Sequence, residues 1–421
     1  MGTLLRYLGF SPLVMLWLLA SAAPSAAQDT LEIRKAMQAM ENGDVESAVL
    51  LFNDAITSFP DSADLYMLRG ICRVETGQGA EAMADYGMAI RLDPQLAEPL
   101  LERARLHVEL GDLDAGLKDI RKCLSLAPDF VEALLLRAEI NLETGNLEDA
   151  WSDLEAARRL APKDPEVYCL RAEAQEFLGD LRRAIKEANL AVKLGPENPL
   201  PYATRAGVLL YSGNPQPALL DIEQAIALAP YQYSLLNTRA YIHWANGDSS
   251  AAMQDLAAYL EADTGAYTAY LTRAFFHESS GQLVEAEADL EQALRRRPTD
   301  VYILTMLGHV YVRMERFSRV VELMEPVVER SPELAFAFSS LGFARFKLGD
   351  EKAGLKDLNR SIKLDSGEPR AWYHRALVYI AMDKLDHACE DLLMAQALGF
   401  ENAYPEDLKD AIRAACQKKG N

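Results

Sequence analysis

The sequence has none of the short motifs that carry most enzyme, metal or nucleotide chemistry. Its 421 residues contain no His-Glu-x-x-His, no Cys-x-x-Cys, no glycine-rich phosphate loop and no serine elbow. We therefore expect no catalytic residue, no metal site and no cofactor, and we interpret the chain as a non-enzyme.

Basic residues are scarce relative to acidic ones. The chain has 43 Lys and Arg side chains against 63 Asp and Glu, which gives a formal net charge of −20. Binding to DNA, RNA or anionic lipid head groups relies on basic side chains that neutralise phosphates. The charge balance therefore argues against nucleic acid or an anionic membrane surface as the main partner.

Charged residues are absent from one long stretch near the amino terminus, Tyr7–Ala27. It contains an apolar run, Leu13–Ala20, and ends in Ser25–Ala27, which has the small-x-small pattern of a signal-peptidase site. This pattern predicts a signal peptide over residues 1–27, cleaved after Ala27, and a periplasmic or secreted mature protein with no membrane span. The alternative is that the stretch remains as an uncleaved membrane anchor.

What the sequence does contain is an internal repeat. Residues 29–402 divide into eleven consecutive units of 34 residues with no insertion or deletion between them. Counted within a unit, position 8 is always Ala or Gly, position 15 is Gly in nine units, and position 32 is Pro in eight. Such a period indicates a solenoid in which each unit is one supersecondary element.

The pattern within a unit predicts two helices, which we call helix A and helix B. Positions 4, 8 and 11 are apolar or small at helical spacing, and positions 20, 24 and 27 repeat that spacing. Gly at position 15 supplies the left-handed conformation that ends helix A. Pro at position 32 stops helix B, because it lacks an amide hydrogen and its ring clashes with a continuing helix.

This unit resembles the tetratricopeptide repeat, which has the same period with small residues and a closing Pro at matching positions. The resemblance implies an all-α, right-handed superhelical solenoid of antiparallel helix pairs over residues 28–402, with helix A of every unit lining a concave groove. It also implies a non-catalytic scaffold that binds a partner protein or an extended peptide. Residues 403–421 are expected to form a capping helix, roughly Pro405–Gln417, over the last repeat.

Two units depart from the pattern. The ninth has Glu315 in place of the turn Gly and Pro326 inside helix B, where we expect a kink. The seventh has Thr264 in place of the closing Pro. We therefore expect a bend or looser packing between Thr264 and Pro332.

Arg and acidic residues recur together across the units. Antiparallel helices bring positions 7 and 23 to the same height, and Arg favours planar pairing with a carboxylate, so we predict a ladder of Arg–carboxylate pairs between helices A and B. The eight pairs are Arg69 with Asp85, Arg103 with Asp119, Arg137 with Asp153, Arg171 with Glu187, Arg205 with Asp221, Arg239 with Asp255, Arg273 with Asp289, and Arg375 with Asp391.

Several histidines and cysteines also fall at repeat positions. His107, His243 and His277 share position 11, so we interpret them as core or half-buried rings rather than metal ligands. Cys72 and Cys123 occupy positions typical of buried small residues and are expected to be packed thiols.

The cysteine count, five, is odd and cannot form a closed disulfide framework. Cys389 lies in the last helix B, and Cys416 lies near the far end of the expected capping helix, antiparallel to it. We predict that these two pair in the oxidised protein.

The residues expected to line the groove divide the chain into two parts. In the family, positions 2, 5, 9, 12 and 13 of helix A face the groove; they carry eleven acids and one aromatic residue in the first five units, but one acid and nine aromatics in the last six. Aromatic residues clustered on one face are typical of a binding site. The predicted partner-binding residues are Tyr211, Tyr241, Trp244, Phe275, Tyr302, Phe336, Phe343, Phe346, Tyr373, Glu139, Glu143 and Glu173.

These observations predict an exported scaffold that holds a partner protein or peptide in its groove, within a bacterial envelope assembly, secretion or export system. The alternative is a periplasmic glycan-binding protein whose aromatic residues stack on sugar rings. Binding of a peptide should weaken with salt through the acidic part, whereas binding of a glycan should depend little on salt.

Overall fold

The computed structural model describes residues 31–400 and 405–416, and the regular elements in these ranges are α-helices with no strand. The A helices are α2 (Leu31–Glu41), α4 (Ala63–Glu75), α6 (Glu98–Glu109), α8 (Val131–Glu143), α10 (Pro165–Phe177), α12 (Pro199–Tyr211), α14 (Ser234–Ala245), α16 (Tyr267–Ser279), α18 (Val301–Arg313), α20 (Ala335–Lys347) and α22 (Pro369–Ala381). The B helices are α3 (Val45–Ser58), α5 (Gly79–Leu92), α7 (Leu113–Leu126), α9 (Leu147–Leu160), α11 (Leu181–Leu194), α13 (Pro215–Leu228), α15 (Ser249–Ala262), α17 (Leu283–Arg296), α19 (Phe317–Arg330), α21 (Glu351–Leu364) and α23 (Leu385–Ala397). One further helix, α24 (Pro405–Cys416), follows them.

The chain divides into two compact units, and each is described by itself. Unit 1 ends at Ala252 and unit 2 begins at Met253, so the division falls in α15 of the seventh repeat. The bend expected between Thr264 and Pro332 lies after this division. Pro326 does not end its helix, since α19 continues from Phe317 to Arg330.

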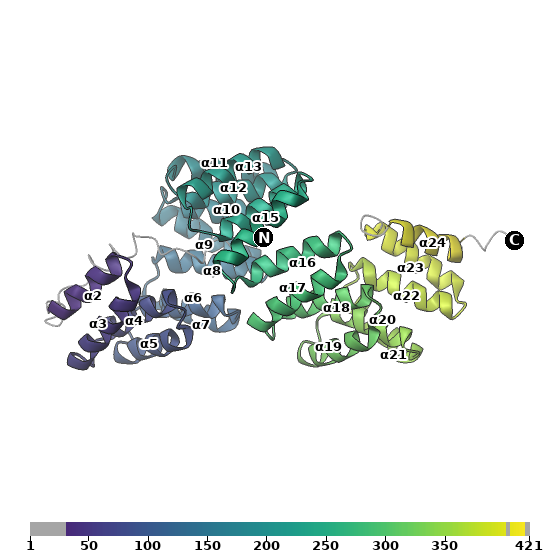
Figure 1. Cartoon of the computed structure of the whole chain (residues 1–421), viewed down its shortest axis with the longest axis horizontal. Coiled ribbons are helices and arrows are strands. Elements are labelled where there is room, and N and C mark those ends of the chain that lie inside the picture. The colour runs from purple at the N-terminus through teal and green to yellow at the C-terminus, as the bar shows by residue number, and fades with distance from the viewer. Residues whose placement is uncertain (1–30, 401–404, 417–421) are drawn as a thin grey trace. The chain divides into compact units, whose positions relative to one another are not determined.

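Within each unit, an A helix packs on the B helix that follows it, and the pairs stack in sequence (Figure 1). Neighbouring A helices such as α10, α12 and α14 also contact one another, whereas neighbouring B helices in the described residues make no comparable contacts. The A helices therefore form the inner layer of each stack. We call their side away from the B helices the A-helix face; it is the side to which the family resemblance assigns positions 2, 5, 9, 12 and 13.

The turn between helices A and B requires a left-handed residue. The Gly residues at position 15 have φ values from 74° to 95°, and a Cβ added there would meet no atom within 4 Å. Backbone conformation, not space, therefore explains the Gly. Glu315 and Asp383 adopt the same conformation, with φ of 56° and 54°, so the fold keeps the turn even without Gly.

Position 8 of helix A is Gly in two repeats in which the facing residue of helix B is large. Tyr86 and Met324 are large and fully buried at position 24, and each faces Gly at position 8 of the same repeat. A Cβ at Gly70 would come within 2.7 Å of the Tyr86 ring, and one at Gly308 within 2.8 Å of Met324 Cε. At Gly70 an Ala would therefore force the Tyr86 ring to shift, whereas at Gly308 the flexible end of the Met324 side chain can move aside.

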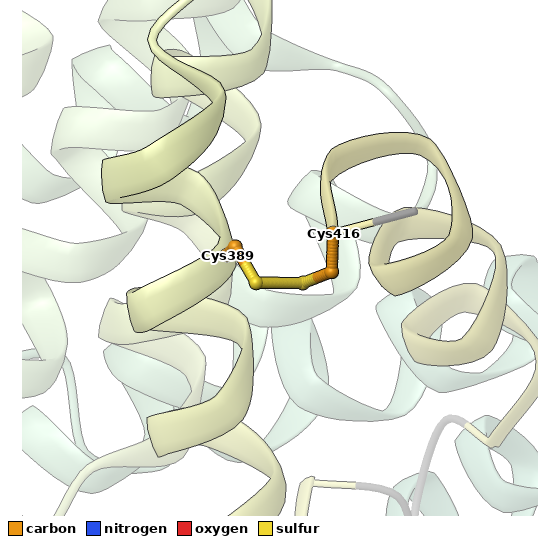
Figure 2. Close-up of a disulfide and its surroundings, with 2 residues drawn as sticks. All are labelled: Cys389 and Cys416. Carbon is orange, nitrogen blue, oxygen red and sulfur yellow. A yellow bond between two sulfur atoms is a disulfide. The ribbon is translucent and has the colours of Figure 1, made fainter. Parts of the chain in front are cut away.

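The C-terminal helix α24 packs on α23 through one apolar side. Leu408, Ala411 and Ala415 are buried there, whereas Lys409 and Arg413 are exposed. A disulfide joins Cys389 of α23 to Cys416 at the end of α24, with an S–S distance of 2.10 Å and Cα atoms 5.1 Å apart (Figure 2). The predicted pairing is therefore present in the structure.

The remaining cysteines are thiols packed in the core. Cys72, Cys123 and Cys169 are buried, and burial raises the pKa of Cys72 and of Cys123 to about 12. These two thiols are therefore protonated and unreactive near neutral pH.

Within residues 31–400 and 405–416, no helix combines the length and the apolar composition that a membrane span requires. The predicted signal peptide, residues 1–27, lies outside the described residues.

Candidate partner-binding faces

The predicted Arg–carboxylate ladder is present. In seven of the eight predicted pairs, both residues belong to the same compact unit, and all seven pairs are formed. In the eighth pair, Arg239 belongs to unit 1 and Asp255 to unit 2. In a representative pair, Arg137 Nε donates to Asp153 Oδ2 at 2.8 Å and its second guanidinium nitrogen donates to Oδ1 at 2.6 Å. Asp153 is buried, so the pair satisfies a carboxylate in the seam between the two helices.

Several of these arginines also bind the preceding repeat, which the sequence analysis missed. Arg205 donates to Asn189 at 2.9 Å as well as to Asp221, and Arg171 binds both Glu155 and Glu187. The extra partners occupy position 25 of the preceding repeat, 16 residues before the Arg. A comparison of the repeats could have revealed these contacts, because position 25 is polar in the repeats that supply the extra partners.

The one acid at position 23 without Arg at position 7 finds a cation elsewhere. Leu341 occupies position 7 of the tenth repeat, and Arg345, one helical turn later, binds Asp357. Arg345 also donates to Glu325 of the preceding repeat at 2.7 Å. The ladder is therefore structural, and the rings of His107 and His277 lie beside it, half-buried near Asp119 and Asp289.

One pair of side chains combines a nucleophile with a base, but it is buried. Ser339 Oγ lies 3.1 Å from His374 Nδ1, and the imidazole stacks on the Phe343 ring with centroids 4.2 Å apart. Ser339 is 1% exposed, so a substrate has no access to its hydroxyl. Burial, followed by the charges of His309 and Arg370, lowers the pKa of His374 to about 3, and the ring is a neutral packing element.

Metal-binding clusters are likewise not formed by the described side chains. No group of three or more His, Cys, Asp or Glu in residues 31–400 and 405–416 is placed to hold a metal ion.

The A-helix face of unit 1 carries acids at one end and aromatic residues at the other. Glu143 is exposed and Glu173 half-buried, while Tyr211 at the end of α12 is 66% exposed. Tyr241 and Trp244 are half-buried on α14. Partial desolvation raises the pKa of Glu75 on this face, although its side chain is exposed overall, so its surroundings disfavour the negative charge.

Glu139 is not available on this face. It was predicted to bind the partner, but only 6% of its surface is exposed. The reason is that α8 lies between α6 and α10 and is buried along most of its length. A residue at position 9 of so enclosed a helix packs among its neighbours.

The A-helix face of unit 2 is aromatic. Tyr302 is 64% exposed at the start of α18, and Phe275 is 42% exposed on α16. Phe336 and Phe346 of α20 and Tyr373 of α22 are half-buried. This face therefore offers aromatic surface on four successive A helices.

Neighbouring side chains hold several of these rings in place. The Arg370 guanidinium lies 4.2 Å from the centroid of the Phe336 ring and binds Glu368 at 2.7 Å. The Tyr373 ring stacks on Phe400 with centroids 4.3 Å apart. These contacts fix the rings before any partner arrives, which lowers the entropy that binding would cost.

Phe343 differs from the other predicted aromatic residues. It is 7% exposed, because His374 stacks on one side of its ring and Phe317 contacts it edge-on. The predicted role of Phe343 as a contact residue is therefore not supported by its burial; it packs beneath the face.

A charged cluster that the sequence analysis did not identify joins two A helices of unit 2. Glu278 of α16 accepts from Arg313 of α18 at 3.2 Å and lies 2.8 Å from His309 Nδ1. Burial opposes ionisation of Glu278, but its hydrogen bonds with His309 and Arg313 outweigh that effect and lower its pKa. The one acid on this aromatic face is therefore already neutralised by its neighbours.

Comparisons with known proteins agree with this architecture. A family model described as tetratricopeptide repeat matches residues 33–97, 101–165 and 204–267, and a second model with the same description matches residues 165–198. Together they match more than half of the chain. In a comparison with curated proteins, no relative matches the sequence.

One solved structure with a similar fold covers nearly the whole chain, and others match parts of it. The Cut9–Hcn1 structure, described as an APC/C hetero-tetramer, aligns with a TM-score of 0.50 at 14% identity over 96% of this chain and 99% of that chain. A tetratricopeptide repeat protein from Parabacteroides merdae gives 0.48 at 21% identity over 57% of this chain and 94% of that one. A tetratricopeptide repeat protein from Thermus thermophilus gives 0.40 at 21% identity over 44% and 99%. At such identities the first of these comparisons supports the solenoid fold alone.

Proposed function

Because the chain belongs to the tetratricopeptide repeat family, whose members generally act as protein-interaction scaffolds, we propose that it is a non-catalytic scaffold that holds a partner protein along its A-helix faces. We further propose that all eleven helix pairs are repeats of this family, including those outside the matched residues. The shared turn, seam and pairing described above support the extension.

The observation that carries the proposal is the exposed aromatic surface of unit 2. Tyr302 and Phe275 expose large rings to solvent, while neighbouring rings are fixed by Arg370 and Phe400. Aromatic side chains that are rigid and partly exposed are the usual anchors of protein interfaces. The proposed partner segment places apolar side chains between these rings.

We also propose that the scaffold works outside the cytoplasm, in a bacterial envelope assembly, secretion or export system. The support is the sequence of residues 1–27, with its apolar run and small-x-small ending. Expression of the full chain, followed by cell fractionation and N-terminal sequencing, tests this. A mature protein that begins at Gln28 in the periplasm supports export, whereas an intact chain in the cytoplasm contradicts it.

The binding proposal is tested with a partner identified by cross-linking in cells that express the chain at native level. Affinity of the purified partner is then measured for wild type, Tyr302→Ala and Val284→Ala. Val284 is 63% exposed on helix B of unit 2 and serves as the matched control off the face. We expect Tyr302→Ala to weaken binding at least about tenfold, equivalent to about 1.4 kcal/mol, and Val284→Ala to leave it unchanged.

Equal affinities for wild type and Tyr302→Ala, with unchanged melting curves, would contradict the assignment of this face. If the captured partner were a glycan, binding would persist with little change between about 50 mM and about 300 mM NaCl. That outcome would replace the protein scaffold by the carbohydrate-binding alternative.

A further inference from the structure

An exposed apolar patch in unit 1 lies at the ends of two neighbouring A helices. Phe177 is the last residue of α10 and Tyr211 the last residue of α12; they are 64% and 66% exposed. Leu178, next to Phe177, is 56% exposed. Because α10 and α12 contact each other and run in the same direction, their C-terminal ends bring these side chains to one edge of the unit. Solvent-exposed rings at equivalent positions of adjacent repeats are not required by the packing of either repeat.

The same repeat position carries acids in the four preceding A helices. Glu41, Glu75, Glu109 and Glu143 end α2, α4, α6 and α8, and all four are exposed. We call this series, continued by Phe177 and Tyr211, the edge strip. All its members are at position 13, so they recur once per repeat along unit 1.

Stability of the helices does not explain the glutamates. The C-terminal end of an α-helix has a partial negative charge from its unpaired carbonyl groups, so a carboxylate there is unfavourable and a cation favourable. The last turns of α2 and α8 contain no basic residue, whereas those of α4 and α6 contain Arg73, which binds Asp85, and His107. Each glutamate thus adds negative charge at a helix end that already has a partial negative charge. The edge strip therefore combines a row of negative charges with an apolar patch.

We propose that the edge strip docks an extended polypeptide segment of a partner protein, with apolar side chains on the patch and Lys or Arg side chains along the glutamates. The inference rests on the proposed scaffold function and specifies the partner chemistry for one edge of the A-helix face of unit 1, whereas the test of that function concerns Tyr302 of unit 2. Charge complementarity sets the chemistry of the segment, because the strip combines carboxylates with the negative ends of helices.

The repeat also sets the spacing of that segment. Packed helices lie about 8–10 Å apart, and an extended chain advances about 3.3–3.6 Å per residue. One strip residue per repeat therefore matches a partner side chain at about every third residue. The segment should have two apolar residues about three positions apart, followed or preceded by basic residues at the same spacing.

The test uses the full purified chain and defined peptides as probes. Two dye-labelled peptides, otherwise made of Ser, each carry two Trp and four Lys, with one of these six residues at every third position. In the first peptide the two Trp precede the four Lys, and in the second they follow them. A third and a fourth peptide have Glu in place of Lys. Fluorescence anisotropy gives the affinities. We expect one of the two Lys peptides to bind at least about tenfold more tightly than the Glu peptide with the same residue order. The binding of this Lys peptide should weaken severalfold between about 50 mM and about 300 mM NaCl.

Variants assign the binding to the strip. We expect Phe177→Ala and Tyr211→Ala each to weaken binding severalfold, and Glu109→Gln combined with Glu143→Gln to reduce its salt dependence. Tyr211→Ser repeats the test if Tyr211→Ala does not fold. Val284→Ala, on helix B of unit 2, should have no effect on these peptides.

Other results overturn the inference. Absence of binding by both Lys peptides, or equal binding of Lys and Glu versions, excludes the strip as a site for basic segments. Loss of binding with Tyr302→Ala but not with Phe177→Ala assigns the peptides to unit 2 instead. Failure of the proposed function would be seen in a different experiment. There, the cellular partner would bind Tyr302→Ala and wild type with equal affinity.

Discussion

The buried acids at position 23 are the residues on which the seam between helices A and B depends most. Asp153 and Asp289 are 5% exposed, and each is held by one Arg of the same repeat, whereas the similarly buried Asp85 is held by both Arg69 and Arg73. A buried carboxylate that loses its only cation keeps the cost of dehydration without the compensating attraction. The importance of each Arg therefore follows from the burial of its acid.

We expect Arg137→Ala to lower the free energy of unfolding by about 1–3 kcal/mol, because it leaves Asp153 buried without its two hydrogen bonds. Replacing both residues, Arg137→Met with Asp153→Leu, should cost less than the single change. Urea unfolding measures both. The control is Arg319→Ala, whose pair with Glu322 is exposed on both sides and should contribute little. A neutral Arg137→Ala would mean that the ladder does not support the fold.

The buried imidazole of His374 should make unit 2 sensitive to acid. Its pKa is about 3 when folded and about 6.5 when unfolded, so the unfolded chain binds more protons between these values. The contribution of His374 to stability is therefore complete above about pH 6.5 and is lost as the pH falls towards about 3. We expect the stability difference between wild type and His374→Gln to shrink by up to about 3 kcal/mol between about pH 7 and about pH 4.

Urea unfolding of both proteins across this pH range provides the measurement, with substitution of the exposed His387 by Gln as the control. Parallel stability curves for wild type and His374→Gln would show that the ring is not held neutral in the folded state.

At the scale of single elements, α24 depends on its neighbour. It is 12 residues long and packs on α23 through a few small or apolar side chains, with Leu408 the largest of those fully buried. Isolated helices of this length are marginal in water. The disulfide from Cys389 to Cys416 keeps the distal end of α24 against α23.

We expect replacement of both cysteines by Ser to destabilise the docking of α24 by about 3 kcal/mol, because the disulfide closes a chain separation of 27 residues. Hydrogen exchange should then show faster exchange in α24 than in α22. Reductant should reproduce the effect in wild type and add nothing in the double Ser variant. Free thiols at both positions in protein isolated from an oxidising compartment would contradict the pairing.

At the scale of the whole molecule, the two units present different surfaces. Unit 1 presents exposed acids with an apolar patch, and unit 2 presents aromatic residues whose one acid is neutralised by Arg313 and His309. Long-range charge mainly governs how fast partners associate, whereas buried aromatic contacts govern how slowly they separate.

The two kinds of surface should therefore respond differently to substitution. We expect Glu109→Lys with Glu143→Lys to slow association of the partner and flatten its salt dependence, with little change in the dissociation rate. Trp244→Ala, on the aromatic part of unit 1, and Tyr302→Ala, in unit 2, should instead speed dissociation, each with a loss of roughly 2 kcal/mol. Surface-immobilised binding at two salt concentrations separates the rates. Unchanged rates for the aromatic variants, with folding intact, would point to the B-helix side or to the ends.

Much of the architecture follows from the sequence because its causes are local and repeated. The left-handed turn, the small residue at position 8 and the Arg–acid seam each involve residues within one repeat, so comparing repeats was enough to predict them. Even the exception supports the rule: Leu341 cannot pair with Asp357, and Arg345 one turn away does so. The Cys389–Cys416 disulfide was predictable for the same reason, since it joins adjacent helices.

Exposure of individual side chains was decided only by tertiary packing. Phe343 and Glu139 occupy the same repeat position as the 42% exposed Phe275, yet both are buried. Their burial comes from neighbouring repeats, since His374 of the next repeat covers Phe343, and α6 and α10 enclose α8. The sequence alone determined which residues recur on the A-helix face; the sizes of side chains one repeat away determined which of them reach solvent, because adjacent repeats pack directly against one another.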